Sequence, residues 1–422
     1  MIQELKSLAL YEEIVEILNK DNFDLYWKGF KKSPFALYNS TTVVLCNHPN
    51  PPQSFSPLCD AYIGPWTDDF VGNTAINLNG YYTAILNMDT LYSLDSSSSL
   101  NKVYSILVHE MFHCHQLSHR EKRWADEMLF INYNFSQNSL ALRLMDKDYL
   151  ICALDDQNKY TRDKLLSDFI QRREKRKNII GSMLNYELAL ESIEGPATYV
   201  EVKALAHRKN IDVIDVAEDF LRTFDFEDLN KYRTSAYVFG LVLCLILDSI
   251  APNWQEDFSN SDVFLYKFFK AKFGSFNELT DFSIDNCYVE SAKELIRKYV
   301  DSKNKAFETF NKTEGYKIII CGNLKLSDFD PMNIVSMDNK ILHKNFIKYN
   351  SNCINGQVLS FHKDDFWTVD KIEFYVSNKP KDFDHGILTD KGTFYGEVSE
   401  RDEVFYVDLY DEKNESNELS AV

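Results

Sequence analysis

The sequence predicts an α+β protein with a mixed N-terminal part, a mainly helical middle region and a small antiparallel β domain at its C-terminus. Apolar residues recur at helical spacing through the middle region, whereas short β-branched and aromatic runs between Asn, Asp and Gly turns dominate beyond residue 314. Glycine and proline are scarce, at 14 and 10 among 422 residues, which favours long helices over a loop-rich sandwich.

Three segments follow from these patterns. Residues 1–100 combine an amphipathic helix over residues 1–20 with strand-like runs at 41–46 and 81–88, which predict a small sheet. Residues 101–313 form the helical region, with helices expected at 102–117, 136–154, 162–194, 212–224, 234–250, 261–273 and 288–310. Residues 314–422 carry β-rich runs at 316–321, 356–361, 366–377, 392–398 and 403–410, followed by a polar tail that we expect to be frayed.

The net charge of the chain indicates which classes of partner are poor candidates. The net charge of −18 repels phosphate backbones and anionic lipid, so nucleic acid and membranes are poor candidates. Such a surface is typical of a soluble protein. The more specific alternative is that the negative charge attracts a basic peptide substrate.

The distribution of cysteines and of apolar runs indicates the cellular compartment. The eight cysteines are scattered and never form a CxxC pair, which indicates free, buried thiols in a reducing compartment such as the cytoplasm. The first 20 residues lack the basic and then apolar pattern of a signal peptide. The longest apolar run, residues 236–247, is too short to span a bilayer, so we expect a buried helix there.

The segment HEMFH, from His109 to His113, fits the metal-binding pattern HExxH. In a helix, residues four apart lie on one face, so both imidazoles can share one metal ion. Glu110 lies beside them, where it can take a proton from a water that the metal activates. These features predict a zinc site, and the alternative is a pair of core histidines bonded to carboxylates. A catalytic zinc needs three protein ligands and an open position.

One candidate for the third ligand follows directly on the same segment. His119 completes the pattern HExxHxxGxxH except at the glycine, where Gln116 stands. No Gly or Pro interrupts the helix between His113 and Trp124, so His119 would lie about 9 Å beyond His113 and about 120° round the axis, out of reach. His115 lies about 200° round the helix axis from His113, so the two side chains point off different faces and cannot share one metal ion.

An acidic stripe supplies the other candidates. It consists of Glu187, Glu191, Glu194 and Glu201. Glu194 is the second candidate ligand, and Glu191, one turn earlier, remains possible. No Lys or Arg balances these acids along the chain before Lys203, and Pro196 predicts a kink or a restart of the helix. A solvated acidic face is the alternative interpretation.

The segment EGPATYVE, residues 194–201, resembles the EG-x-A-x-Y-x-E segment of gluzincin metallopeptidases, notably their aminopeptidase-like branch. Together with HEMFH, the resemblance covers two short motifs within about residues 85–250. It implies a zincin-like metallopeptidase domain in which His109, His113 and Glu194 bind zinc and Glu110 is the general base. Glu194 follows His113 by 81 residues, a gap in which the helical segment at 136–154 can form an inserted hairpin. Ile193 stands where that family usually has Asn.

The resemblance also implies further parts of the site. Gluzincins often place a Tyr or His donor opposite the metal to stabilise the oxyanion, and Tyr237 is our first candidate for this role and Tyr232 the second. His207 is a weaker candidate, because its position is more typical of a helix C-terminus. The strand before the HExxH helix would line the cleft, which would put Asn87 and Asp89 near the cleft edge.

The sequence therefore predicts a zinc-dependent metallohydrolase of gluzincin type, more specifically a peptidase acting on peptide or protein substrates in the cytoplasm. The alternative is a catalytically inactive binding or scaffold protein that keeps the metallopeptidase fold and binds its partner through the C-terminal β domain. The oligomeric state stays open.

Overall fold

The computed structural model describes residues 2–89, 96–131, 133, 135–156, 158–274, 283–350, 352–363 and 365–409. The described chain is an α+β protein, as the sequence predicts. It divides into two compact units, the first made of Met1–Asp126 and Phe135–Lys293, the second of Glu127–Asn134 and Glu294–Val422. Residues 1–100 therefore belong to the same unit as most of the helices, and the boundary near residue 314 moves into the last helix.

The first unit contains most of the helices. They are α1 (Ile2–Lys20), α2 (Ser96–Ser118), α4 (Gln137–Asp155), α5 (Lys159–Ile180), α6 (Met183–Lys209), α7 (Val213–Thr223), α8 (Tyr232–Ile250), α9 (Trp254–Ser259) and α10 (Leu265–Phe273), with short 3-10 turns at Phe23–Leu25 and Leu229–Lys231. Its strands are β1 (Phe35–Tyr38), β2 (Thr42–Cys46), β3 (Ser56–Leu58), β4 (Ala61–Pro65), β5 (Thr74–Leu78) and β6 (Tyr81–Asn87).

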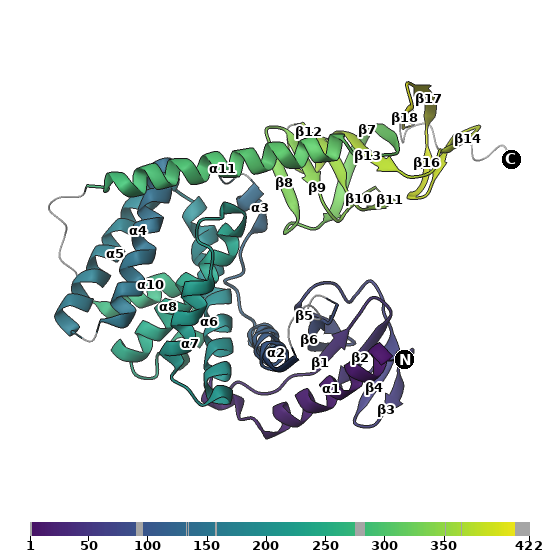
Figure 1. The fold of residues 1–422 in the computed structure, drawn as a ribbon. Coiled ribbons are helices and arrows are strands. Elements are labelled where there is room, and N and C mark those ends of the chain that lie inside the picture. Colours follow the sequence, from purple (N-terminus) through teal and green to yellow (C-terminus); the bar gives the residue numbers. More distant parts are fainter. Residues whose placement is uncertain are drawn as a thin grey trace. The chain divides into compact units, whose positions relative to one another are not determined.

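These strands form one six-stranded sheet in the order β3-β4-β2-β1-β6-β5. All neighbours run antiparallel except β1 and β6, which are parallel. Strand β6 is buried on both faces: Ala84 and Leu86 join the core shared with the helices, and Ile85 joins a separate cluster on the other face. Helix α2 packs against β5 and β6 (Figure 1). The sequence located β2 and β6 and missed the other strands of this sheet.

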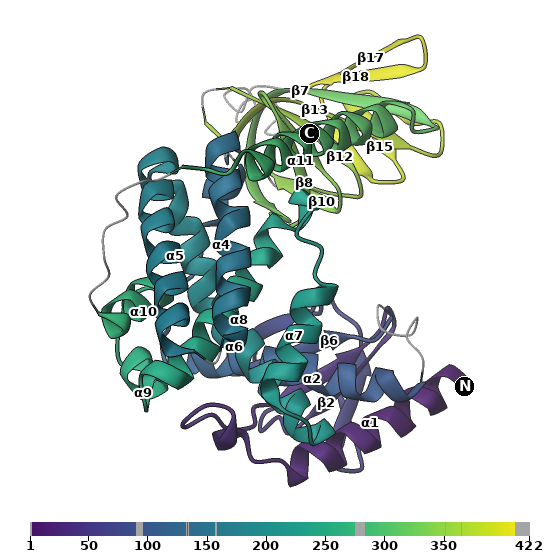
Figure 2. The same ribbon diagram turned by 60° about the vertical axis from the view of Figure 1, so that its left-hand side comes forward.

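Helices α4, α5, α6 and α8 run side by side in the first unit (Figure 2). The single helix expected at residues 162–194 is wrong, because the chain breaks into α5 and α6 at Gly181. That glycine has a φ of 57°, a left-handed conformation that an L side chain rarely adopts, and it closes the C-terminus of α5. The break lets α6 start in a new direction, while α5 packs along α4, the helix before it.

Helix α6 lies at the centre of the first unit. It continues from Met183 to Lys209 with Pro196 in its interior, so of the kink or restart expected there, the restart does not occur. A proline inside a helix costs about 3 kcal/mol or more. The burial of α6 offsets that cost, since α2, α7, α8 and α10 all pack on it.

Helix α8 carries the long apolar run, and its side chains from Val238 to Leu247 are buried, as expected. Among the described residues, the segment Leu229–Ile250 is the one stretch long and apolar enough to cross a membrane by composition. Its apolar window is 67% buried inside the protein, which is typical of a core helix.

All eight cysteines are free. The expectation that they are buried holds for Cys46, Cys114 and Cys244, whereas Cys59, Cys152, Cys287 and Cys353 are exposed and Cys321 is intermediate.

The second unit contains α3 (Glu127–Ile131), the larger part of α11 (Asn286–Asn311) and the remaining strands. The strands are β7 (Tyr316–Phe329), β8 (Ile334–Met337), β9 (Lys340–His343), β10 (Phe346–Tyr349), β11 (Asn352–Asn355), β12 (Val358–His362), β13 (Thr368–Val376), β14 (Lys381–Phe383), β15 (Gly386–Thr389), β16 (Gly392–Tyr395), β17 (Glu397–Arg401) and β18 (Val404–Asp408).

Nine of these strands form one sheet and β14-β15-β16 form another. The sheets are antiparallel as predicted, except that β18 runs parallel to β7. Phe307 and Phe310 of α11 pack against Leu342 and Leu359 of the large sheet, which covers part of its apolar surface. The polar tail beyond residue 410 lies outside the described residues.

Candidate metal centre

Helices α2 and α6 bring together three side chains that lie far apart in sequence. The Nε2 atoms of His109 and His113 are 3.1 Å apart. Oε2 of Glu194 lies 3.4 Å from the first of these atoms and 3.3 Å from the second. Within the part of the chain that the structure describes, this is the one group of three or more His, Cys, Asp or Glu donor atoms that lie within 4.8 Å of one another.

The spacing of these donor atoms fits a tetrahedral metal ion. Bonds of about 2.0–2.2 Å, as zinc makes to imidazole nitrogen and carboxylate oxygen, place the ligand atoms of a tetrahedron about 3.3–3.6 Å apart. The observed separations of 3.1–3.4 Å need only a small expansion to match. Two nitrogens and one carboxylate oxygen also leave the fourth position open, as in catalytic zinc sites.

The Nδ1 atom of each histidine lies close to a second polar group. Nδ1 of His109 lies 3.2 Å from a carboxylate oxygen of Glu201, which also accepts a hydrogen bond from Ser105. Nδ1 of His113 lies 2.7 Å from Oε1 of Gln116. Such partners orient the imidazoles of metal sites and direct the other ring nitrogen toward the ion.

Buried charges in the site shift one another's ionisation. Burial opposes the charged form of His109, but hydrogen bonds with Glu194 and Glu201 and the charge of Glu110 outweigh it and raise the pKa of His109 well above its usual value. Burial likewise opposes ionisation of Glu194, yet the charge of His113 and hydrogen bonds with both histidines hold the pKa of Glu194 well below its usual range. Glu194 therefore stabilises the charged form of each histidine, and the two histidines stabilise its carboxylate.

Glu110 is buried beside the two histidines and is 7% exposed. Burial raises the pKa of its carboxyl group, and the charges of His109 and His113 oppose that rise in part. A carboxylate in such an environment is a stronger base than one in water.

Tyr237 and Arg233 of α8 lie close to the same His–His–Glu group. The Arg233 guanidinium lies 3.5 Å from Oε1 of Glu194 and also donates a hydrogen bond to the Tyr237 hydroxyl. The Tyr237 ring stacks on the ring of His109, with centroids 6.4 Å apart. Burial and the nearby charge of Glu194 raise the pKa of Tyr237 well above its usual value, which keeps the hydroxyl protonated and able to donate.

Glu187 and Glu191 of the stripe belong to a different environment, which we call the arginine cluster. It consists of Arg143, Arg172, Arg173, Arg176, Asp146, Glu187 and Glu191, all buried between α4, α5 and α6. The stripe is thus not a solvated face, and its charges are balanced by arginines from neighbouring helices, which the local sequence did not indicate.

Two sequence candidates lie in the arginine cluster. Glu191 pairs with Arg173 at 2.6 Å and is not part of the His–His–Glu group. The Tyr232 hydroxyl donates to Glu187 at 2.7 Å, so this tyrosine is committed to the arginine cluster. Of the two tyrosines considered, Tyr237 is the one beside the candidate ligands.

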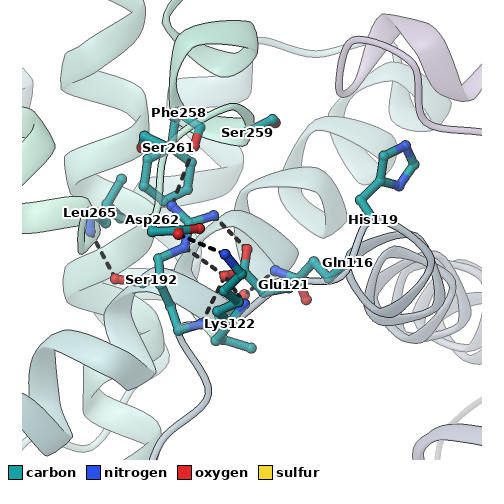
Figure 3. Close-up of polar contacts among 12 residues, drawn as sticks. Gln116, His119, Glu121, Lys122, Ser192, Phe258, Ser259, Ser261, Asp262 and Leu265 are labelled. Atoms are coloured by element: carbon teal, nitrogen blue, oxygen red, sulfur yellow. Dashed lines mark hydrogen bonds and ion pairs between the residues drawn. The ribbon is translucent and has the colours of Figure 1, made fainter.

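Helix α2 does not continue to Trp124, as the sequence suggested, but ends at Ser118. Arg120 adopts the left-handed conformation with a φ of 58°, and the Glu121 N–H bonds back to the Gln116 carbonyl, which is a helix C-cap without glycine. His119 lies beyond this end, and its Nδ1 hydrogen-bonds to the backbone carbonyl of His115. Figure 3 shows His119 pointing away from Gln116 and Glu121.

His115 and His207 also lie outside the group. The His115 ring packs against Phe30 and Phe112, and burial lowers the pKa of His115 to about 4. His207 stands in the last turn of α6, at an exposed position, as expected for a residue near a helix C-terminus.

The strand expected to line the cleft is already part of a sheet on both sides. Strand β6 pairs with β1 over Ala84–Asn87 and with β5 over Tyr81–Ile85, so much of its backbone is hydrogen-bonded within the sheet. Asn87 bonds through its backbone N–H to Asn73, and the Asp89 carboxylate accepts the N–H of Ser40.

No sequence pattern indicated a role for several residues around the group. Gln116 stood only where the pattern has a glycine, Trp124 only marked the end of a stretch without Gly or Pro, and Arg233 had no assigned role. The Trp124 ring lies 6.3 Å from the ring of His113 and remains 42% exposed. Glu201 carried one signal, since it lies seven residues after Glu194 and therefore on the same helix face.

The fold and this site define an α+β protein with a buried His–His–Glu group, on two packed helices, that could hold a metal ion. Comparisons with protein-family models, with curated proteins and with solved structures gave no match.

Proposed function

We propose that this protein is a zinc-dependent metallohydrolase of gluzincin type that cleaves peptide bonds. One observation carries the proposal: the HExxH histidines of α2 and Glu194 of α6 converge with donor atoms 3.1–3.4 Å apart, and Glu110 is buried beside them. The zincin-like character of the helical region is part of this proposal and rests on the same residues.

A zinc ion held by His109, His113 and Glu194 would supply a Lewis acid that polarises a carbonyl group and makes water more acidic. In the proposed reaction, Glu110 accepts a proton from the attacking water and delivers it to the leaving amine. Burial of Glu110 supports this role, because a desolvated carboxylate binds a proton more strongly.

Tyr237 is the proposed oxyanion donor. Its hydroxyl accepts a hydrogen bond from Arg233 and also hydrogen-bonds with the Glu194 carboxylate, so its proton lies beside a proposed zinc ligand. Donors aimed at developing negative charge supply a large share of catalysis in acyl-transfer enzymes. We place the reaction in the cytoplasm on peptide or protein substrates, in keeping with the eight free cysteines and the net charge of −18.

Metal content tests the ligand set. Purified wild type should contain near-stoichiometric zinc by mass spectrometry, and Glu194→Ala should lose most of it because a three-ligand site becomes a two-ligand site. His119→Ala is the matched control and should keep wild-type zinc. Zinc-free wild type would refute the proposal, and loss of zinc in His119→Ala but not in Glu194→Ala would refute the gluzincin ligand set.

Hydrolysis tests the general base. A peptide library analysed by mass spectrometry should show cleavage by wild type, and Glu110→Gln should lower kcat about 10²–10⁴-fold while keeping its zinc. Glu227→Gln, an exposed change of the same kind, should cleave normally. A wild type that binds zinc but cleaves no peptide would instead support the binding or scaffold function.

A further inference from the structure

Gln116 connects the two helices that carry the candidate ligands. It stands on α2, three residues after His113, and its side chain is 6% exposed. Its amide makes two hydrogen bonds, one with Nδ1 of His113 at 2.7 Å and one to the backbone carbonyl of Ile193 at 2.8 Å. Ile193 immediately precedes Glu194, so the amide lies between one ligand and the neighbour of another.

The Ile193 carbonyl fixes the orientation of this amide. A backbone carbonyl can only accept a hydrogen bond, so the amide atom that faces it must be the NH2 nitrogen. The oxygen of the Gln116 amide therefore faces His113, and an oxygen can only accept from the imidazole. It follows that Nδ1 of His113 carries a proton, and that the lone pair of a neutral His113 lies on Nε2, the atom facing Glu194 and His109.

We propose that Gln116 is a positioning residue of the metal site, which fixes the tautomer and ring orientation of His113 and ties α2 to α6 next to Glu194. This inference rests on the metal site of the proposed function. A glycine at this position, as in the HExxHxxGxxH pattern, could do neither. Partners of this kind typically change metal affinity about 10–100-fold when they are removed.

Two substitutions separate the two contacts. Gln116→Met fills similar space but offers His113 no strong acceptor and Ile193 no donor. Gln116→Glu keeps an acceptor for Nδ1 of His113, but its carboxylate cannot donate to the Ile193 carbonyl. Ser118→Ala, an exposed change two residues later on α2, is the control.

The experiment measures the affinity for zinc ion alone by competition with a chromophoric chelator. Far-UV circular dichroism of each zinc-free protein verifies that it folds. We expect the zinc Kd of Gln116→Met to rise about 10–100-fold, with Gln116→Glu within about threefold of wild type. The zinc-free Gln116→Glu protein should melt at a lower temperature, because the link between α2 and α6 is lost. The absorption spectrum of the cobalt-loaded protein should change in Gln116→Met and stay close to wild type in Gln116→Glu.

The outcomes distinguish this inference from the proposed function. Wild-type zinc affinity in Gln116→Met would overturn the inference while leaving the metal site intact. An equal loss of affinity in both variants would overturn the action through His113. A wild type that binds no zinc would refute both the proposed metal site and this inference.

Discussion

Glu187, Glu191 and Glu194 lie within about two turns of α6, yet each has a different chemical setting. Glu187 accepts hydrogen bonds from Arg176 and Tyr232, and Glu191 pairs with Arg173. Glu194 instead faces two histidines. Residue type and spacing are the same for all three, so the group opposite each carboxylate decides its role.

The two tyrosines of α8 permit a matched test of the oxyanion donor. We expect Tyr237→Phe to lower kcat about 10²–10³-fold with little change in zinc affinity, because it removes one donor from the site. Tyr232→Phe should leave kcat near wild type and cost about 1 kcal/mol of stability, since it removes a hydroxyl from Glu187 in the arginine cluster. Steady-state peptide hydrolysis and thermal melting measure both effects. Unchanged kcat in Tyr237→Phe would rule out this role.

At the scale of elements, the approach of α6 to α8 sets the position of Glu194. Gly195 and Gly240 meet at the contact, where a Cβ added to Gly240 would lie 2.5 Å from Cα of Gly195 and 2.6 Å from the carbonyl oxygen of Glu191. Both atoms belong to a backbone, so neither can move aside without shifting a helix. Two glycines therefore let the helices pack closely beside a candidate ligand.

Gly240→Ala should accordingly destabilise the protein and disturb the site. Overpacking of this kind costs about 1–3 kcal/mol, and the shift of α6 should weaken zinc binding because Glu194 adjoins Gly195. Ser249→Ala, an exposed change near the end of α8, should alter neither property. Thermal melting of the zinc-free protein and chelator competition measure the two effects, and a Gly240→Ala protein with wild-type values would disprove the close-packing argument.

The sequence predicted helices well where a periodic apolar pattern extended over many residues. It predicted helix ends poorly where a single residue determines them. Helices α2, α4, α7 and α8 appeared at their expected positions because apolar spacing over many residues marks a buried face. The break between α5 and α6 depends on one glycine, and the end of α2 on one arginine with positive φ. The two candidate ligand histidines came from spacing on one helix, whereas Gln116 carried no signal because its partners lie on two different helices.

At the scale of the whole molecule, acid stability depends on histidines that are buried without charge. His343 of β9 lies in the second unit, is 1% exposed, and bonds through Nε2 to the Ser360 hydroxyl at 2.9 Å. Burial, together with the nearby His362, lowers the pKa of His343 to about 3. Between about pH 6.5 and pH 3 the unfolded chain binds a proton at this residue that the folded chain does not, so stability falls as the pH falls.

His343→Gln should flatten this dependence. For wild type, the contribution of His343 should decrease by about 2 kcal/mol between pH 7 and pH 5, and a glutamine, which does not titrate, removes that contribution. Urea denaturation followed by far-UV circular dichroism at both pH values measures the difference. His385→Gln, at an exposed position, should keep the wild-type profile. An identical loss of stability on acidification in wild type and His343→Gln would contradict the prediction.

The sequence by itself determined the order of helical and β-rich segments and the pairing of His109 with His113 on one helix face. Both follow from backbone geometry within a few residues, which repeats wherever the pattern occurs. The tertiary structure decided which carboxylate faces the histidines, which carboxylates face arginines, and that Gln116 bridges two helices. These choices depend on neighbours tens of residues away along the chain, and only the packing of α2, α4, α5, α6 and α8 brings those neighbours within hydrogen-bonding distance.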